Sequence, residues 1–492
     1  MTDLPHFALL IDGQRRSGSK GQTMESVNPA TGEVWATFDC ASAEDVDRAV
    51  EAARAMLDDP RWRDLTPTAR GKLLARLADL IADNAEHLGR LETSDSGKLL
   101  AETATQTAYV ADYYRYFAGL ADKIEGAVLP IDKPHMHVFT KPVPIGVVAA
   151  IVPWNAQMFL TATKLGPALA AGCTVVLKAS EIAPAAVLEF AALFEQAGFP
   201  PGVVSVITGD AENCAIPLTR HPDIARIAFT GGPATARHVV RNSAENLAVT
   251  TLELGGKSPI LVFEDADIET AANGLIAGNF GASGQSCVAG SRGLVHRSVF
   301  HEVVEAVRRK SEGLVVGDPL DGVTHIGPLC TMAQIETIER TLAKASDQGA
   351  VVHFGGRRAG TSGHFFEPTL VECTDPRTET LLVEMFGPVM SLMAFEDERE
   401  AIRLANDSAF GLGSGVFTRD LARAHRVSER LRAGICWINT YRAVSPIAPF
   451  GGFGQSGYGR EAGTESVKDY LRTRTTWIST SAEPMANPFV MR

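Results

Sequence analysis

The sequence predicts an α/β protein with two domains, each built on a largely parallel sheet. Three observations support this fold class. At 492 residues the chain is too long for a single hydrophobic core of the usual size. Apolar runs alternate with stretches of helical spacing from Gly146 to Phe229, and the same alternation begins again at Pro259. Strands that alternate with helices form parallel sheets with helices on both faces.

The first 125 residues begin with turns and continue with helices. Short apolar runs between residues 7 and 39 are separated by Gly13, Asn28-Pro29 and Thr31-Gly32, which predicts hairpins. Apolar residues then recur at helical spacing and predict three helices: one that Ser42 caps, one over 66–84 and one over about 101–121.

Residues 126–144 are extended and are interrupted by four prolines, at positions 130, 134, 142 and 144. Such a segment is typical of a projecting hairpin rather than of core, and an arm of this kind often pairs with another subunit.

The alternating region gives the strands of both sheets. We expect strands over 146–152, 173–177, 203–208 and 224–229 in the first domain, and over 260–263 and 293–296 in the second. Asp265-Ala-Asp267 should cap the first helix of the second domain, and another helix should follow over 299–311. The tail from Val467 to Ser479 is again rich in residues that favour strands.

Composition excludes several classes of function. A formal charge of −12 without clustered Lys and Arg disfavours a nucleic-acid partner. The N-terminus lacks a signal-peptide pattern, and the longest apolar run, Ile145 to Trp154, is too short to span a bilayer. Seven scattered cysteines without a CxxC pair argue against a disulfide framework and a zinc site. We therefore expect a cytoplasmic protein with no metal and no membrane partner.

Cys287 stands alone among small and polar residues, in Gly281-Ala-Ser-Gly-Gln-Ser-Cys287-Val-Ala-Gly-Ser-Arg292. Structural cysteines usually lie among large apolar neighbours, whereas small neighbours leave the sulfur accessible to a ligand. A thiolate is a far better nucleophile than a thiol, so a catalytic cysteine needs a base, a positive dipole or a cation nearby. A lone cysteine in a glycine-rich loop is more often inert, so further residues must support this interpretation.

Two residues supply that support. Glu253, in Leu252-Glu-Leu-Gly-Gly-Lys-Ser-Pro259, is a candidate base, and its glycine flank permits a mobile side chain. Asn155, in Pro153-Trp-Asn155, can donate its amide to a developing oxyanion, with the Cys287 N–H as a second donor. The alternatives are a solvated carboxylate at a strand end and an asparagine that only forms a turn.

Three stretches are candidates for binding a dinucleotide. Phe229-Thr-Gly-Gly-Pro-Ala-Thr-Ala236 follows a strand and opens a helix, where a glycine lets a pyrophosphate approach backbone N–H groups, although the stretch is no GxGxxG fingerprint. Lys178 and Glu181 follow another strand and suit a ribose. Glu384 and Phe386 suit a second ribose and a ring face. Ordinary turns and a surface ion pair are the alternatives.

With these residues the chain resembles the NAD(P)-dependent aldehyde dehydrogenase superfamily over essentially its whole length. Five motifs occur in the family's order, and the interval between Glu253 and Cys287 is similar to the family's. The motifs are Pro153-Trp-Asn155, Glu253-Leu-Gly-Gly-Lys-Ser-Pro259, Gly284-Gln-Ser-Cys287, Glu384-Met-Phe-Gly-Pro388 and Pro449-Phe-Gly-Gly452.

The resemblance implies an aldehyde dehydrogenase-like fold in three parts. A Rossmann-type cofactor domain would comprise residues 1–125 and 145–255, and an α/β catalytic domain would run from 256 to about 465. A small β oligomerisation arm would comprise residues 126–144 and 466–492. The family also implies self-association as a dimer or tetramer, between which the sequence does not choose.

The resemblance implies a mechanism as well. The Cys287 thiolate would attack a small-molecule aldehyde, and Asn155 with the Cys287 N–H would stabilise the oxyanion. Hydride would pass to the nicotinamide, and Glu253 would activate the water that hydrolyses the thioester. Lys164 and Glu461 match positions of a proton relay behind Glu253.

The cofactor residues are carried over in the same way. Lys178 and Glu181 would hold the adenosine ribose, Glu384 the nicotinamide ribose, and Phe386 would pack near the nicotinamide. The other implied residues are Trp154, Gly209, Phe229, Thr230, Gly231, Gly232, Leu254 and Gly255. Gly232 and Ala236 depart from the family's usual serine and glycine. Glu181 favours NAD, because a carboxylate accepts the 2′-hydroxyl and repels a 2′-phosphate, but NADP remains an alternative.

The substrate tunnel is implied by family comparison too. Its expected residues are Tyr109, Ala156, Met158, Phe159, Thr163, Ser286, Val288, Val444 and Phe450. Small Ala156 and Thr163 stand where many relatives carry aromatic residues, which predicts a roomy, mostly apolar pocket for bulky or aromatic aldehydes. Arg442 would favour a semialdehyde with a remote carboxylate if it points inward, and would otherwise face solvent at the rim.

Two further classes of function remain as alternatives. One is a relative that passes the thioester to coenzyme A or phosphate, against which the retained Glu253 argues. The other is a binding or structural protein on the same fold, which loss of Cys287 or Glu253 would have supported.

Overall fold

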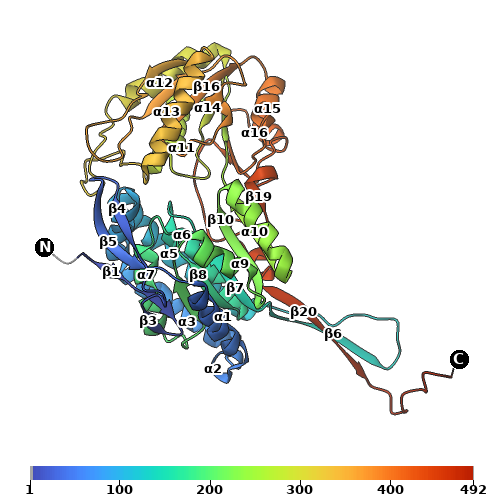
Figure 1. Ribbon diagram of the computed structural model, residues 1–492. Coiled ribbons are helices and arrows are strands. Elements are labelled where there is room, and N and C mark those ends of the chain that lie inside the picture. The colour runs from blue at the N-terminus through green and yellow to red at the C-terminus, as the bar shows by residue number, and fades with distance from the viewer. Residues whose placement is uncertain (1–3, 491–492) are drawn as a thin grey trace.

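Two sheets form the two lobes of the molecule (Figure 1). The computed structural model describes residues 4–490. The first sheet has eight strands, in the order β19 (Gly457–Tyr458), β11 (Val249–Leu254), β10 (Ile224–Gly231), β7 (Val147–Ile151), β8 (Thr174–Lys178), β9 (Val204–Ile207), β2 (Leu9–Ile11) and β3 (Gln14–Arg16). The strands from β11 to β9 run parallel, whereas β19 and β2 are antiparallel to their neighbours.

The second sheet has seven strands, all parallel except β14 at one edge. Their order is β14 (Val351–Phe354), β15 (Thr369–Glu372), β16 (Val389–Phe395), β13 (Arg292–His296), β12 (Pro259–Val262), β17 (Gly413–Phe417) and β18 (Ile435–Ile438). The predicted α/β fold class with two largely parallel sheets is therefore confirmed.

Alternate residues of the central strands face two separate cores. In β7, Val148 and Ala150 pack into one hydrophobic cluster, whereas Val147 and Ala149 pack into another on the opposite face. The second sheet repeats this division, with Ile260 in one cluster and its neighbour Leu261 in another. Because side chains alternate across a strand, both faces must be covered by helices, which explains the continuous apolar runs in the sequence.

The helices cover these faces. Those before the second sheet are α1 (Ala43–Asp58), α2 (Pro60–Arg63), α3 (Pro67–Asp83), α4 (Ala85–Ser96), α5 (Leu100–Leu120), α6 (Gln157–Ala171), α7 (Ala185–Phe190), α8 (Ala192–Ala197), α9 (Ile216–Arg220) and α10 (Pro233–Asn246). The later ones are α11 (Ile268–Asn279), α12 (Phe300–Ser311), α13 (Met332–Asp347), α14 (Glu379–Leu382), α15 (Glu398–Asn406), α16 (Leu421–Ser428) and α17 (Glu465–Lys468). No helix within residues 4–490 is long and apolar enough to cross a membrane.

The predicted helix starts agree with the structure. Ser42 forms a capping box with Asp45 at the start of α1, Thr66 caps α3, and Asp267 caps α11. A hydroxyl or carboxylate at these positions accepts a hydrogen bond from an N–H group of the first turn, which has no partner within the helix.

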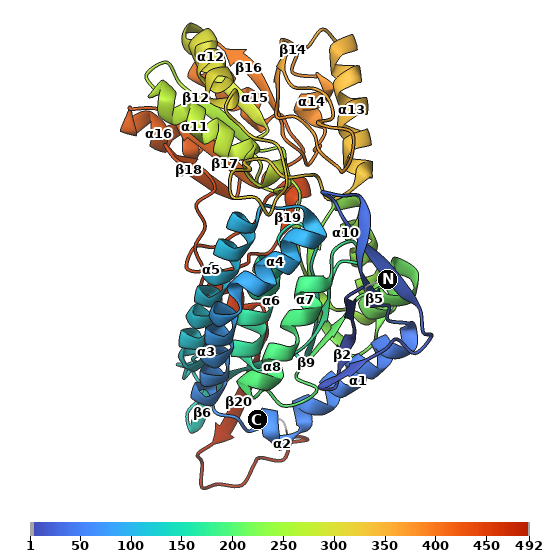
Figure 2. The same cartoon turned by 90° about the vertical axis from the view of Figure 1, so that its left-hand side faces the viewer.

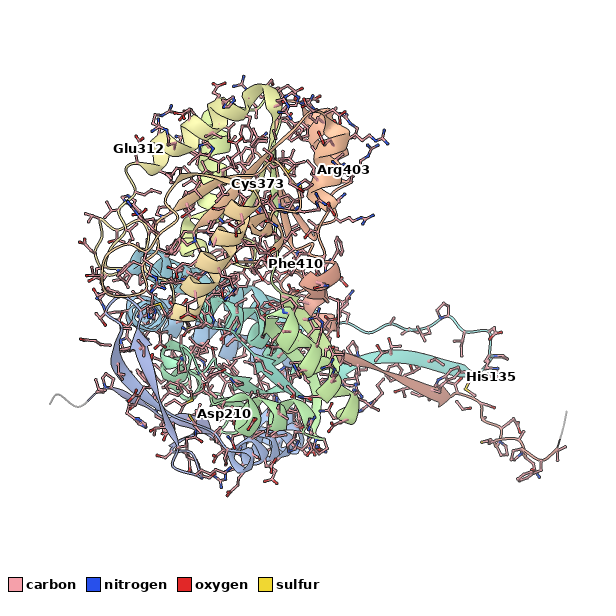
Figure 3. The ribbon with its side chains drawn as sticks, turned by 45° about the horizontal axis from the view of Figure 1, so that its top comes forward. His135, Asp210, Glu312, Cys373, Arg403 and Phe410 are labelled. Carbon is pink, nitrogen blue, oxygen red and sulfur yellow. The ribbon has the colours of Figure 1, made fainter. Side chains whose placement is uncertain are left out.

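The arm projects from the first lobe, and His135 lies towards its far end (Figure 3). Strand β6 (Met136–Pro144) pairs antiparallel with β20 (Leu471–Ser479), so segments far apart in the sequence meet here. Within 126–144 the predicted hairpin is present, because the Leu129 N–H donates to the Val138 carbonyl over 2.9 Å. A smaller sheet is formed by β1 (His6–Phe7), β5 (Glu33–Asp39) and β4 (Thr23–Asn28). The hairpins expected near the N-terminus are present, as β2 with β3 in the first sheet and β4 with β5 in this one.

The chain returns from the second lobe to the first through β19 (Figure 2). Gly457 and Tyr458 add to the first sheet, and Ala462 and Val467 pack into one of its cores. We had assigned residues up to about 465 to the second domain. The exact domain boundaries stay a prediction, but this return places the 450–461 segment between the two lobes.

Candidate active site

Two cavities meet at Cys287 and Asn155, and Leu160 also borders both. The first, of about 260 Å³, is further lined by Pro153, Trp154, Thr230, Gly231, Gly232, Leu254, Gly255, Gln334, Glu384 and Phe386. The second, of about 510 Å³, is further lined by Lys98, Ala101, Glu102, Thr105, Gln106, Tyr109, Ala156, Phe159, Ala282, Gln285, Ser286, Val288, Arg442, Val444 and Phe450. Most of the residues expected to bind the cofactor line the smaller cavity, and most of those expected to bind the substrate line the larger one.

The loop before Cys287 has a strained backbone. Ala282, Ser283 and Gly284 are consecutive residues with φ of 52°, 52° and 73°. The left-handed conformation costs a residue other than glycine roughly 1–2 kcal/mol. Such a loop persists only where its surroundings hold it in place.

Side chains and backbone groups from distant parts of the chain hold this loop. The Ala282 N–H donates to Glu102 over 2.9 Å, and the Ser283 hydroxyl donates to the Gly327 carbonyl over 2.9 Å. Asn155 donates its amide to the Gln285 carbonyl over 3.0 Å. The loop that carries Cys287 is thus fixed to both lobes.

The Cys287 thiol is protonated at neutral pH in this environment. Burial raises its pKa to about 12, and the nearby carboxylates of Glu384 and Glu253 add to the rise. The Val288 N–H and the Arg442 guanidinium oppose it. Nucleophilic attack by this cysteine therefore requires a base or a new positive charge.

Glu253 is buried at the end of β11 with 3% of its surface exposed, and neither carboxylate oxygen has a hydrogen-bond partner among the described residues. Burial and the charge of Glu461 raise its pKa well above 4.5, while Lys164 and Arg460 oppose the rise. A Cβ atom at Gly451 would lie 2.6 Å from Glu253 Oε1, so only glycine leaves room for the carboxyl there. Such a carboxyl, unpaired and with a raised pKa, suits a general base.

Lys164 and Glu461 form a fully buried ion pair. The Lys164 ammonium also donates to the Thr230 hydroxyl over 2.6 Å, and Thr230 lines the smaller cavity. The Thr163 hydroxyl donates to Glu461 Oε2 over 2.6 Å. The hydrogen-bonded chain thus runs from Thr230 at the smaller cavity to Glu461.

Thr163 and Met158 do not line the larger cavity, contrary to our expectation. Both are almost fully buried, and Thr163 lies behind the cavity wall because the 450–461 segment covers that part of α6. Ala156, which precedes α6, and Phe159, on its first turn, do reach the cavity.

Glu384 and the start of α10 shape the smaller cavity. The Gly256 N–H donates to Glu384 Oε1 over 2.9 Å, and a Cβ atom at Gly255 would lie 2.0 Å from this carboxylate. Burial raises the pKa of Glu384 to about 7, opposed by the Gly256 N–H and the Lys257 charge. Gly232 precedes α10, no side chain caps that helix, and its first N–H groups can bind an anion.

Four of the expected cofactor residues lie outside this cavity. Lys178 and Glu181 pair with each other over 2.8 Å at the end of β8. Gly209 lies just beyond β9, and its Cβ position is 3.1 Å from the Ala41 carbonyl oxygen. Phe229 is buried in a core beneath Gly231, so it supports the turn from within.

One wall of the larger cavity was missed by the sequence analysis. It comprises Lys98 and, on the first turns of α5, residues 101, 102, 105 and 106. Lys98 is buried and donates to Glu92 over 3.0 Å and to Gln106 over 2.8 Å. These positions share a helix face with Tyr109, so the spacing from Tyr109 could have found them. The cavity therefore has a polar wall next to Tyr109.

Arg442 borders the larger cavity rather than lying apart from it. Its backbone is left-handed with φ of 64°, and its guanidinium donates to the Ala277 carbonyl over 3.2 Å. None of the ion pairs within residues 4–490 includes Arg442, so no carboxylate there lies at salt-bridge distance from its guanidinium. The guanidinium thus offers an unneutralised positive charge at the cavity.

Comparison with known proteins agrees with this geometry. The model of the aldehyde dehydrogenase family matches residues 16–476. This chain belongs to the aldehyde dehydrogenase family. The resemblance stated from the motifs is confirmed.

Among its relatives in the aldehyde dehydrogenase family is the (Z)-2-((N-methylformamido)methylene)-5-hydroxybutyrolactone dehydrogenase of Acinetobacter baylyi. The two sequences are 52% identical over 490 residues, which are 99% of this chain and 100% of the relative.

Solved structures of aldehyde dehydrogenases share the fold closely. A betaine aldehyde dehydrogenase from Staphylococcus aureus in complex with NAD+ is 36% identical with a TM-score of 0.95, and the match covers 98% of this chain and 96% of that one. An aldehyde dehydrogenase from Bacillus cereus, also in complex with NAD+, is 38% identical with a TM-score of 0.94, and the match covers 96% of both chains.

Proposed function

We propose that this aldehyde dehydrogenase oxidises its substrate to a carboxylic acid through a thioester on Cys287, with NAD+ as the hydride acceptor. The observation that carries this proposal is the position of Cys287 at the junction of the two cavities. A nucleophile placed there can hold the substrate carbon next to a bound nicotinamide.

Cys287 and Glu253 would act together. Glu253 is an unpaired carboxylate with a raised pKa, close enough for its charge to affect the Cys287 thiol. It can take up the proton of the water that attacks the thioester, while the positive charge of a bound nicotinamide would favour the Cys287 thiolate. The buried Lys164–Glu461 pair lies near enough to Glu253 to affect its pKa, and the two groups can carry protons away.

Asn155 would stabilise the oxyanion that forms when Cys287 attacks the aldehyde carbon. Its side chain borders both cavities and is fixed by Gln285, so little reorganisation is needed at the moment of reaction. The Cys287 N–H would be the second donor. The tetrahedral adduct then loses hydride and becomes the thioester.

The residues around the smaller cavity fit a dinucleotide. The open start of α10 suits a pyrophosphate, the Glu384 carboxylate suits ribose hydroxyls, and Trp154 and Phe386 pack with ring centroids 5.5 Å apart beside the same space. NAD+ bound here would supply the hydride acceptor.

The choice between NAD and NADP would rest on Glu181. Its carboxylate pairs with Lys178 at the end of β8 and would accept a ribose 2′-hydroxyl. A 2′-phosphate at the same place would be repelled. We therefore propose NAD, with NADP as the alternative.

Two classes of aldehyde fit the larger cavity. Tyr109, Phe159 and Phe450 give it an aromatic wall, and its volume of about 510 Å³ suits a bulky or aromatic aldehyde. The second class, a semialdehyde, is favoured by Arg442, whose free guanidinium would pair with a remote carboxylate.

The relative from A. baylyi adds support to the second class. Its name specifies a 5-hydroxybutyrolactone, a ring in which one carbon bears both the ring oxygen and a hydroxyl group. Such a ring is the closed form of an aldehyde that carries a carboxylic acid, so a substrate of this type would present the group that Arg442 can bind.

The test is the rate of NADH formation with a panel of aldehydes. The panel comprises benzaldehydes, terpenoid aldehydes, short aliphatic aldehydes, aminoaldehydes and carboxylated semialdehydes, each with NAD and with NADP. Preference for bulky neutral aldehydes would place Arg442 at the rim, and preference for semialdehydes would make it the specificity residue. No NADH with any member would contradict the proposed function and favour a non-catalytic protein.

Self-association through the arm is also proposed. Trp477 and Ile478 of β20 and Met136 of β6 are large apolar side chains that stay exposed, with Trp477 54% exposed. Their burial against a second copy would form a dimer or tetramer. Light scattering should show that Trp477→Lys lowers the oligomer mass. Cytoplasmic location, expected from the sequence, stays a prediction.

A further inference from the structure

A small cavity separates the Cys287 loop from the segment of Glu384. Its volume is about 10 Å³. Gly284, Ser286 and Ser291 line it from the loop, Glu384 to Gly387 line it from the other segment, and Lys257 and Asn279 complete the wall. Any group held here contacts both the nucleophile's loop and the proposed ribose-binding carboxylate.

Lys257 and Asn279 are buried polar residues that the reaction does not use. Lys257 is 2% exposed and Asn279 is fully buried. The Lys257 amine and both polar atoms of the Asn279 amide have no hydrogen-bond partner among the described residues. Buried polar groups are almost always hydrogen-bonded, because leaving one unpaired costs free energy. Two such residues at one cavity indicate a shared ligand.

Size and charge identify the chemical class of that ligand. A space of this volume holds about one water molecule. A metal cation would be repelled by the Lys257 amine and the nearby Arg292 guanidinium, and an anion would be repelled by the Glu384 carboxylate. Water can accept from the Lys257 amine and donate to the Asn279 carbonyl oxygen, so it gives each of the two residues a hydrogen-bond partner.

We propose that Lys257 and Asn279 share one ordered water, which ties the Cys287 loop to the Glu384 segment. Lys257 and Asn279 are thus positioning residues: the water fixes the distance between the thiol and the carboxylate that faces the cofactor. Lys257 is next to Gly256, whose N–H already binds Glu384, so the water closes a second connection to the same segment. This consequence for the cofactor rests on the proposed function, whereas the water site itself does not.

The protonation of Lys257 is compatible with this role. Burial and the Arg292 charge lower its pKa to about 7, while Glu384 and Cys373 oppose the fall. In either protonation state the amine has N–H groups to donate to the water.

A crystal structure of the full chain tests the site directly and needs no activity. Electron density for one water within hydrogen-bonding distance of Lys257 Nζ and of the Asn279 amide is expected. A direct hydrogen bond between a protein group and Lys257 Nζ, or a site closed by side chains, would overturn the proposal.

A double-mutant cycle tests the connection to the cofactor. The variants are Lys257→Met, Asn279→Leu and the double variant, and the measurement is the Kd for NADH from quenching of tryptophan fluorescence. Each single change should raise Kd roughly tenfold, and the double variant should stay near that value, because both changes remove the same water. A Kd for NADH that rises roughly a hundredfold in the double variant would mean that the two changes act independently, and would overturn the shared site.

Lys344→Met is the control, because Lys344 lies on the surface of α13, where it pairs with Glu379. Its Kd for NADH should equal that of the unchanged protein. If the unchanged protein binds no NADH, the proposed function fails, and the crystallographic water still decides the site. An unaltered Kd in all three variants would contradict the connection to Glu384.

Discussion

Asn155 donates its side-chain amide to the carbonyl oxygen of Gln285, a residue of the loop that leads to Cys287, over 3.0 Å. The two residues come from different lobes, so this hydrogen bond helps to hold the Cys287 loop against the turn after β7. The same asparagine faces both cavities and can reach a substrate bound to Cys287.

Asn155→Ala should therefore lower kcat on the order of 10²- to 10³-fold, because the variant loses both the proposed oxyanion donor and the hydrogen bond that holds the Cys287 loop. Steady-state NADH formation measures this effect. Asn406→Ala is the matched control, since Asn406 also donates to a backbone carbonyl, that of Arg430, but far from the cavities. Equal rates in the two variants would remove Asn155 from the proposed oxyanion site.

Glu253→Gln should slow hydrolysis of the thioester more than its formation. A stoichiometric burst of NADH followed by little turnover is expected in rapid-mixing experiments, because glutamine cannot take a proton from water. Absence of any burst would place the need for Glu253 at or before hydride transfer.

The raised pKa of Glu253 also predicts a dependence of stability on pH. A carboxyl whose pKa is raised on folding contributes stability below its unfolded pKa of about 4.5, and that contribution is lost as pH rises through the folded pKa. From pH about 4.5 upward, the unchanged protein should lose Tm relative to Glu253→Gln. Parallel Tm profiles for the two proteins would contradict the raised pKa.

Glu384 should make binding of NAD+ depend on pH near neutrality. Its pKa is raised to about 7, and only the ionised carboxylate accepts hydrogen bonds from both ribose hydroxyls. KM for NAD+ should fall as pH rises through about 7, and Glu384→Gln should abolish that change. A pH-independent KM in the unchanged protein would argue against a ribose contact.

The fold and the candidate site could be predicted from the sequence to different extents. Strand runs around β7 and β8 are continuous because both faces are buried, so their limits agree with the structure to within two residues. Cys287, Glu253 and Asn155 stand in motifs with unusual local chemistry, and their motifs gave the family. The connection of 450–461 between the lobes has no local signal, and this is why the position of Thr163 behind the cavity wall was missed.

The polar wall of the larger cavity shows a second limit. Helical spacing from Tyr109 gives the face of α5 that carries residues 101, 102, 105 and 106, but it does not place Lys98, which precedes the helix. Lys98 donates a hydrogen bond to Gln106 across the start of that helix. This contact becomes visible only in the structure, where α5 packs on α6. The water site beside Lys257 was likewise hidden, because its residues are far apart in the sequence.

Arg442→Met tests the substrate class. For carboxylated semialdehydes, KM should rise roughly tenfold or more, because a charge-assisted pair with the remote carboxylate is lost, whereas neutral aldehydes should keep their KM. Arg432→Met, which removes an exposed arginine of the same lobe, should change neither. Equal effects on charged and neutral substrates would remove Arg442 as the specificity residue.

The covalent step at Cys287 is tested most directly by mass spectrometry of the Glu253→Gln protein after incubation with NAD+ and a productive aldehyde. We predict an acyl group on the peptide that contains Cys287. The acyl group should be absent when Cys287→Ala is added and retained when the partly buried Cys436 of β18 is changed to Ala. An acyl group on another residue, or NADH turnover that survives Cys287→Ala, would contradict Cys287 as the nucleophile.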